Sequence, residues 1–161
     1  MSCLSGVRFP PLPPQGQHDE LTSRDEILAS YTLSESLFEQ AETLVMKLFA
    51  VGSEWAAKQG LILVDTKYEL GLDRNGLLTV IDEIHTPDSS RYFYLNDYKI
   101  RQELGQSQKQ LSKEFVREWL IANNFQGKDG QTIPELTDDF VDSVSNRYIE
   151  LYTQITGKNF I

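Results

Sequence analysis

The sequence predicts an α+β fold in which helices flank an antiparallel hairpin or small sheet. Apolar residues recur at helical intervals over residues 37–56 and 140–155. Two strand-like runs, residues 61–70 and 77–84, are joined through Asn75-Gly76, the strongest short signal for a hairpin. With 161 residues, 40% of them hydrophobic, the chain can bury a core without disulfides or a structural metal.

Proline dominates the beginning of the chain. Pro10, Pro11, Pro13 and Pro14 all fall within residues 1–15. Each proline fixes its own backbone and removes a hydrogen-bond donor, so regular structure is disfavoured there. We therefore expect residues 1–15 to be a disordered leader and residues 16–161 to hold the folded part.

Two helix-start signals follow the leader. Ser23 and Glu26 have the spacing of a capping box, which predicts a short helix over 24–30. Thr32 and Glu35 repeat that spacing before a much longer apolar stripe, and Gly60 supplies a left-handed stop. The second signal predicts one long helix that ends just before the first strand.

Two more helices are predicted in the C-terminal part. The first covers residues 107–123 and turns Phe115, Val116, Trp119 and Leu120 inward. The second covers residues 137–156, begins with two acidic residues and ends at a glycine. The hairpin between the two helical parts needs further strands to complete a sheet.

Composition excludes several classes of function. The chain carries 15 Lys and Arg against 24 Asp and Glu, a formal net charge of -9, which disfavours a nucleic-acid partner. No apolar stretch approaches the about 20 residues of a membrane span, and no signal peptide is recognisable. The single cysteine indicates a reducing environment. The chain is therefore expected in the cytoplasm, with no membrane and no nucleic acid as partner.

Charged residues gather on the predicted hairpin. Side chains alternate along a strand, so Asp65, Lys67 and Glu69 should share one face with Leu61 and Leu63. Apolar neighbours on that face favour a cleft over a plain solvated surface. The face is our first candidate site.

The register of the hairpin decides which charges meet. A two-residue turn at Asn75-Gly76 would set Glu69 directly opposite Asp82, with Cβ atoms about 5 Å apart, and a hard cation such as Mg²⁺ would relieve their repulsion. A four-residue loop would instead set Lys67 opposite Asp82 as an ordinary ion pair. A three-residue loop would bring Glu83 opposite Glu69.

The segment after the second strand offers groups for an anion. Residues 86–91 combine hydroxyl donors, Ser90 among them, with Arg91, whose planar fork suits a phosphate or carboxylate. The alternative is a Ser/Asp turn that carries a surface arginine. Glycine-rich phosphate loops of the GxGxxG or GxxxxGK type are missing, and His18 and His85 have no ligand spacing.

Several of these segments together resemble one family. Residues 64–71 (VDTKYELG), Asp82-Glu83 and residues 86–91 (TPDSSR) closely resemble the SAICAR synthetases of purine biosynthesis. Residues 16–20 (GQHDE) are similar to a Gly-x-His-Asp-Glu segment of that family, and residues 112–120 (SKEFVREWL) resemble the C-terminal half of its yeast-like branch. The resemblance covers about residues 16–161.

The resemblance implies a fold related to the ATP-grasp type and an ATP-dependent ligase. Such an enzyme phosphorylates the carboxylate of carboxyaminoimidazole ribonucleotide and joins it to the amine of aspartate, with Mg²⁺ and ATP. Carried over by position, Lys67 and Asp65 are implied as catalytic and Arg91 and Ser90 as substrate-binding. Lys67, Glu69 and Asp82 are implied at the nucleotide, and Glu69 and Asp82 at the metal.

The chain also departs from the family. Its members begin with a smaller β-rich domain that contains a Gly-Lys-x-Lys-type segment over the ATP phosphates, followed by a central stretch with an arginine and a serine for the substrate, and we find neither pattern in these 161 residues. We therefore expect the C-terminal portion of such an enzyme. The alternative is a non-catalytic binding module that keeps weak affinity for Mg-nucleotide or ribonucleotide. Either form could pair with a separate N-terminal half or form a homo-oligomer.

Overall fold

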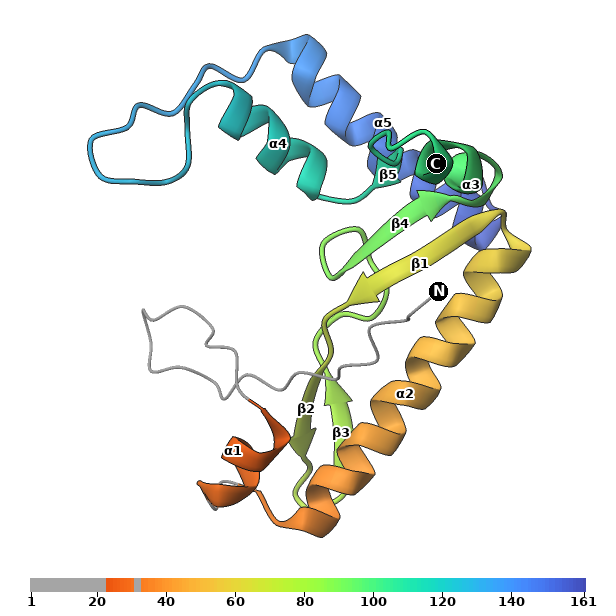
Figure 1. Ribbon diagram of the computed structural model, residues 1–161, viewed down its shortest axis with the longest axis vertical. Helices are drawn as coiled ribbons and strands as arrows, with labels where there is room; N and C mark the ends of the chain where they lie inside the picture. The colour runs from red at the N-terminus through yellow and green to blue at the C-terminus, as the bar shows by residue number, and fades with distance from the viewer. Residues whose placement is uncertain (1–22, 31–32) are drawn as a thin grey trace. The chain divides into compact units, whose positions relative to one another are not determined.

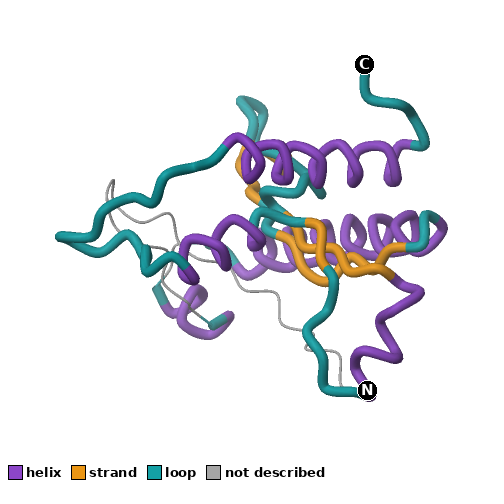
Figure 2. The backbone as a smooth tube through the Cα atoms, turned by 90° about the horizontal axis from the view of Figure 1, so that it is seen from above, coloured by secondary structure: helices purple, strands orange, loops and turns teal. Residues whose placement is uncertain are grey.

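The computed structural model describes residues 23–30 and 33–161. The predictions for the leader 1–15, for residues 16–20 and for Thr32 lie outside these residues. The described residues divide into two compact units: those between 23 and 47 with residues 70–79, and residues 48–69 with residues 80–161. Helices and short antiparallel strands occur together, which confirms the α+β class (Figures 1 and 2).

The first unit holds helix α1 (Arg24–Ala29), the first part of α2 (Glu35–Lys58) and most of a hairpin formed by β2 (Glu69–Leu72) and β3 (Leu78–Ile81). The predicted capping box is confirmed. Ser23 Oγ accepts from the Glu26 N–H at 3.3 Å, and the Glu26 carboxylate accepts from the Ser23 N–H at 2.7 Å. The start of α2 is capped by Ser34, whose Oγ accepts from the Leu37 N–H at 3.3 Å.

The hairpin loop is wider than a two-residue turn. The Asp73 N–H donates to the Leu77 carbonyl at 2.9 Å, and the Gly76 N–H donates to the Asp73 carbonyl at 3.0 Å. These bonds enclose three loop residues, the last of which is Gly76 at φ 76°. The Asp73 carboxylate accepts from the backbone N–H groups of Leu77 and Asn75, both at 2.8 Å, which holds the loop open and lowers the pKa of Asp73.

This loop corrects the predicted register. Continued one residue at a time from the Asp73–Leu77 pair, the pairing places Glu69 opposite Ile81, at the far ends of β2 and β3. Asp82 follows the end of β3 with φ 69°, so its backbone has left the strand. The direct pairing of Glu69 with Asp82 is therefore wrong, as are the alternative pairings of Lys67 with Asp82 and of Glu69 with Glu83.

The second unit is built on a three-stranded sheet of order β1-β4-β5, formed by β1 (Leu61–Thr66), β4 (Ser90–Tyr94) and β5 (Gln110–Leu111). Strands β1 and β4 lie side by side and antiparallel (Figure 1). Helix α3 (Leu95–Glu103) lies between β4 and β5 in the chain, and α4 (Glu114–Ala122) and α5 (Asp138–Thr156) follow β5.

One face of this sheet carries the core of the second unit. Its buried side chains come from three strands, from the end of α2 and from α5, and are Ala56, Leu61, Leu63, Tyr92, Leu111 and Leu151. Two further contacts join α2 and the residues after it to α5. Trp55 Nε1 donates to the Ile155 carbonyl at 2.8 Å, and Gln154 Nε2 donates to the Gln59 carbonyl at 2.9 Å. Both long helices therefore stabilise the same sheet.

The sequence missed part of this unit. The strand predicted over residues 61–70 is two strands in separate sheets, β1 and β2, with a break at Lys67-Tyr68. Strand β4 and helix α3 were not predicted. The helix predicted over residues 107–123 begins only at Glu114, because Gln110 and Leu111 pair with β4. Helix α5 is confirmed, with Thr137 as its cap and Gly157 at φ 68° as its stop.

None of the helices in the described part of the chain combines the length and the apolar character that crossing a bilayer requires.

Candidate anion-binding site

An open pocket of about 320 Å³ lies on the second unit where three segments of the chain meet. Residues 65–67 at the end of β1, residues 87–91 at the start of β4 and residues 112–114 after β5 line it. The antiparallel order β1-β4-β5 brings these segments together, although they are far apart in the sequence. Four predicted site residues, Asp65, Lys67, Ser90 and Arg91, are among them.

A β-bulge determines where Asp65 points. Leu61 to Leu63 pair one for one with Tyr94 to Tyr92, but Asp65 pairs with Arg91, so Val64 is an extra residue in β1. Without this bulge the alternation would turn Asp65 toward the buried face of Leu61 and Leu63. The bulge instead places Asp65 on the face of Arg91. The prediction that Asp65 shares a face with those leucines is therefore wrong.

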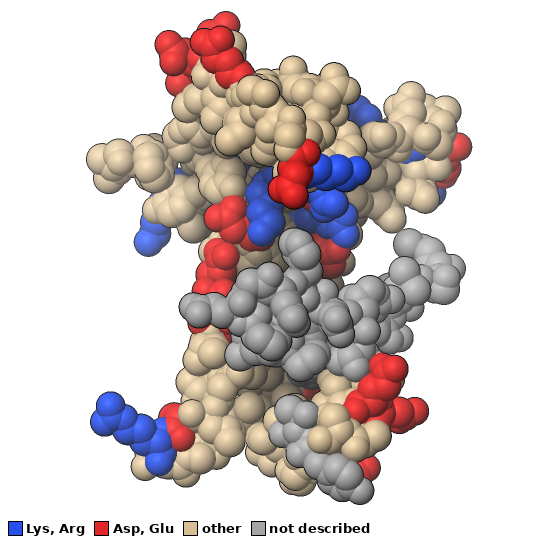
Figure 3. Space-filling view, turned by 90° about the vertical axis from the view of Figure 1, so that its left-hand side faces the viewer, with Lys and Arg blue, Asp and Glu red and all other residues tan. Residues whose placement is uncertain are grey.

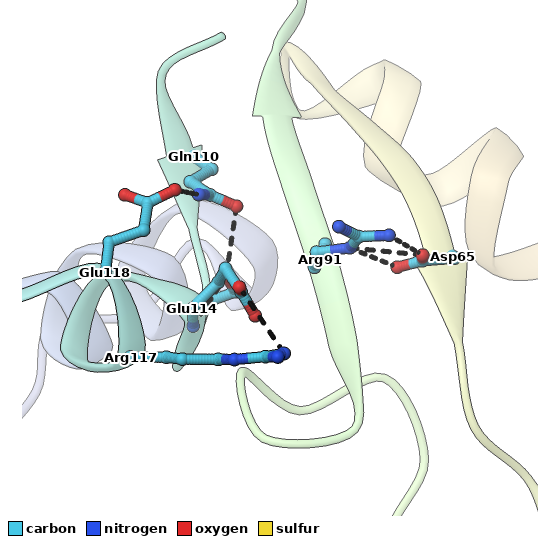
Figure 4. A network of polar contacts seen from close by, with 7 residues as sticks. Asp65, Arg91, Gln110, Glu114, Arg117 and Glu118 are labelled. Carbon is cyan, nitrogen blue, oxygen red and sulfur yellow. Dashed lines mark hydrogen bonds and ion pairs between the residues drawn. The ribbon is translucent and has the colours of Figure 1, made fainter. Parts of the chain in front are cut away.

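Arg91 and Asp65 form the most specific polar contact of the pocket (Figure 4). Arg91 Nε donates to both carboxylate oxygens of Asp65, at 2.9 and 3.1 Å, and Nη2 donates to Oδ2. The hydrogen bond to Asp65 raises the pKa of Arg91. Both side chains are about half exposed, at 46% and 49%, so the pair borders solvent and a ligand can reach it.

Lys67 lines the pocket and forms an ion pair with Glu69, which is not among the lining residues. Lys67 Nζ is 2.6 Å from Glu69 Oε1, and the Lys67 N–H donates to the Ser89 carbonyl at 2.9 Å. Asp82 is exposed and lies beyond the end of β3. Among the described residues no three His, Cys, Asp or Glu side chains form a group able to hold a metal.

Ser90 differs from the other predicted site residues because it is buried. It is 4% exposed and its hydroxyl donates to Thr66 Oγ1 at 2.8 Å, across the β1–β4 pair. Ser89, its neighbour, is less buried, and the two hydroxyl oxygens are 3.2 Å apart. Ser89 therefore presents more surface to the pocket than Ser90 does.

The third wall of the pocket was not predicted as part of a site. Ser112, Lys113 and Glu114 reach it because β5 pairs with β4, and the Lys113 N–H donates to the Pro87 carbonyl at 3.1 Å. Glu114 Oε1 lies 3.7 Å from Arg117 Nη1 on the same helix (Figure 4). Residues 112–120 were recognised as family-like, and their likeness was the only sequence signal for this wall.

The surface of the molecule mixes charges of both signs. On one face, Lys and Arg side chains gather beside Asp and Glu side chains (Figure 3). In the pocket the same mixture consists of cationic groups from Lys67, Arg91 and Lys113 among carboxylates and hydroxyls. Such a set can bind an anion and orient it through a planar guanidinium.

Comparison with known proteins gives one consistent family. A family model described as SAICAR synthetase matches residues 13–132. The phosphoribosylaminoimidazole-succinocarboxamide synthase of Bacteroides thetaiotaomicron is 56% identical over 146 residues, covering 91% of this chain and 46% of that protein. The synthase of Cytophaga hutchinsonii is 57% identical, with 89% and 46% covered.

A solved structure agrees with these relatives. The SAICAR synthase of Saccharomyces cerevisiae, solved in complex with SAICAR, is 34% identical with a TM-score of 0.71, over 88% of this chain and 45% of the yeast chain. This chain therefore spans about half the length of the relatives it matches. The matched residues and the shared fold together confirm the resemblance seen in the sequence, and the chain belongs to the SAICAR synthetase family.

Proposed function

We propose that this chain supplies part of the active site of a SAICAR synthetase, an ATP-dependent ligase that joins aspartate to carboxyaminoimidazole ribonucleotide. The Arg91–Asp65 pair, held at the mouth of an open pocket, is the observation that carries the proposal. The 56% identity to the Bacteroides thetaiotaomicron synthase and the SAICAR bound to the yeast structure support it.

On the substrate side, Arg91 is proposed to bind the anionic groups of the ribonucleotide. Two of its nitrogens donate to Asp65, and a guanidinium has five N–H donors in all, so further donors remain for a phosphate or carboxylate. Asp65 fixes the plane of the guanidinium and so orients those donors. Ser90 contributes indirectly, because its hydroxyl donates to the hydroxyl of Thr66, which lines the pocket.

On the nucleotide side, Lys67 is proposed to stabilise the negative charge that develops on the transferred phosphoryl group. In this view Asp65 and Lys67 are the catalytic pair. Glu69 and Asp82 would hold Mg²⁺, because carboxylate oxygens are the donors it prefers and one or two of them suffice when phosphates complete the shell. The ion, when bound, neutralises phosphate charge.

A second candidate function follows from the coverage of the relatives. Since the chain matches only 46% of the Bacteroides protein, it could bind ligand without turnover, or act with a separate polypeptide or a second copy that completes the site. ATP, aspartate and carboxyaminoimidazole ribonucleotide are the proposed small-molecule partners, and we place the reaction in the cytoplasm.

Calorimetric titration with SAICAR and with Mg·ADP tests the proposal. We expect binding of both, with Lys67→Ala weakening Mg·ADP about tenfold or more, because a direct charge-assisted contact is lost. Lys99→Ala on α3 is the matched control, since it removes the same charge outside the residues that line the pocket. The absence of binding of either ligand, with the fold intact, would overturn the proposal.

A further inference from the structure

The loop that joins β3 to β4 enters the candidate site and has an unusual backbone. It covers residues 82–89, and Pro87, Asp88 and Ser89 form part of the pocket wall. Two of its residues, Asp82 at φ 69° and His85 at φ 58°, adopt the left-handed conformation that side-chain-bearing residues seldom take. Such a loop keeps its shape only when its surroundings fix it.

Three tyrosine hydroxyls from three parts of the second unit fix the loop. Tyr68, just after β1, lies with its hydroxyl 2.5 Å from His85 Nε2. Tyr92 on β4 donates to the His85 carbonyl at 2.8 Å, and Tyr148 on α5 donates to Asp88 Oδ1 at 2.5 Å. His85 thus takes part in two of these hydrogen bonds, one through its ring and one through its backbone carbonyl.

The His85 ring packs against the backbone of helix α2. The ring packs against Gly52, where a Cβ atom would overlap Cε1 and would lie 2.7 Å from Nδ1. Helical glycines are unfavourable, so a glycine here needs a reason, and the close approach of the imidazole supplies one. The half-buried ring is therefore held between the α2 backbone and the Tyr68 hydroxyl.

Backbone hydrogen bonds connect this loop to the walls of the pocket. The Ser90 N–H donates to the Thr86 carbonyl at 2.9 Å, directly after His85. The Lys113 N–H donates to the Pro87 carbonyl, and the Lys67 N–H donates to the Ser89 carbonyl. All three walls of the pocket are thus tied to the loop that His85 holds.

We propose that His85 is a positioning residue for the site. Its ring packs against Gly52 and is hydrogen-bonded to Tyr68, and these contacts fix the loop so that Ser89 and Arg91 are held in one orientation toward an anionic ligand. The consequence for ligand binding rests on the proposed function, whereas the effect on the loop does not. Burial lowers the pKa of His85 and raises the pKa of Tyr68 to about 12, which favours the neutral form of both side chains.

Two substitutions separate this role from general stability. Gly52→Ala keeps both His85 and Tyr68, but its Cβ atom displaces the His85 ring from the α2 backbone. Tyr68→Phe removes one hydroxyl and keeps the aromatic ring. Val51→Ala, at an exposed neighbour on α2, and Tyr98→Phe, on α3, are the matched controls.

Amide hydrogen exchange followed by NMR measures the loop directly. We expect exchange at the Ser90 and Lys113 amides to rise about tenfold or more in Gly52→Ala and Tyr68→Phe, with the other amides of the β1–β4 ladder, residues 61–66 and 91–94, unchanged. The controls should leave all of these rates unchanged. Equal rates in every variant would overturn the proposal, and so would a rise shared by the ladder, because that outcome reports loss of global stability only.

Calorimetric titration with SAICAR then measures the consequence for binding. We expect about tenfold weaker binding in both test variants and unchanged binding in both controls. Faster loop exchange with unchanged affinity would overturn the positioning role. If the unsubstituted chain binds no SAICAR, the proposed function fails, and the control of the loop by His85 is then decided by amide exchange alone.

Discussion

Arg91→Lys separates the contribution of the arginine to ligand binding from its contribution to the fold. Lysine keeps the positive charge but loses the planar fork that now donates from two nitrogens to Asp65. If Arg91 acts mainly on a ligand, affinity should change far more than stability. If the pair with Asp65 mainly stabilises the fold, the free energy of unfolding should change more than the affinity.

The expected sizes of the two effects follow from exposure. Arg91 and Asp65 are 46% and 49% exposed, so their ion pair contributes only about 0.5 kcal/mol to the free energy of unfolding. Hydrogen bonds to a charged ligand are worth about 1.5–3 kcal/mol. Since about 1.4 kcal/mol corresponds to a tenfold change, SAICAR affinity should fall about 10- to 100-fold.

Calorimetry with SAICAR and urea unfolding measure the two quantities on the same protein. Arg117→Lys on α4 is the control, because Arg117 is 71% exposed and its 3.7 Å contact with Glu114 is a surface pair. We expect that control to change neither quantity. Equal SAICAR affinity for Arg91→Lys and the unsubstituted chain would refute the reasoning.

Four further predictions follow from the structure. Leu61→Ala removes a fully buried core side chain and should lower the free energy of unfolding in urea by about 2–4 kcal/mol. Gly157→Ala should cost about 1 kcal/mol in the same assay, because the α5 stop has φ 68°. Glu69→Gln and Asp82→Asn should each abolish Mg-dependent ADP binding and leave the circular dichroism unchanged, and retained binding in both would exclude the metal site. Burial lowers the folded-state pKa of His85, so below its ordinary value of about 6.5 the unfolded chain binds more protons and stability falls with falling pH. His85→Asn should remove that part of the slope, and an identical slope would contradict it.

Local signals explain what the sequence predicted well. The capping box at Ser23 and Glu26, and the Thr137 cap and Gly157 stop of α5, each act within one helical turn. Such signals do not depend on the rest of the fold, so the first and last helices could be predicted almost to the residue. The long apolar stripe of α2 was also sufficient, without any other contact, to predict a helix there.

Contacts between distant residues explain what the sequence missed. The pairing of β1 with β4, rather than with the next strand-like run, depends on residues about thirty positions apart. The short β5 exists only because Leu111 pairs with Tyr92. Periodicity within one segment contains no information about either pair.

Turn chemistry explains the error at the candidate site. The Asn-Gly pair suggested a two-residue turn, but the Asp73 carboxylate accepts from two backbone N–H groups and widens the loop. The wider loop shifts the register by one residue, so Glu69 lies opposite Ile81, the neighbour of Asp82. The bulge at Val64 had no sequence signal either, yet it decides that Asp65 faces Arg91.

ADP release tests the central claim that this chain supplies part of a SAICAR synthetase site. The chain would be assayed with ATP, Mg²⁺, aspartate and carboxyaminoimidazole ribonucleotide, with each omitted in turn. Each assay would be run alone and with the portion of the Bacteroides thetaiotaomicron relative that this chain does not match. We expect ADP release that requires all four components and is lost in Lys67→Ala. Release that ignores aspartate and the ribonucleotide, or no release in either arrangement, would contradict the claim.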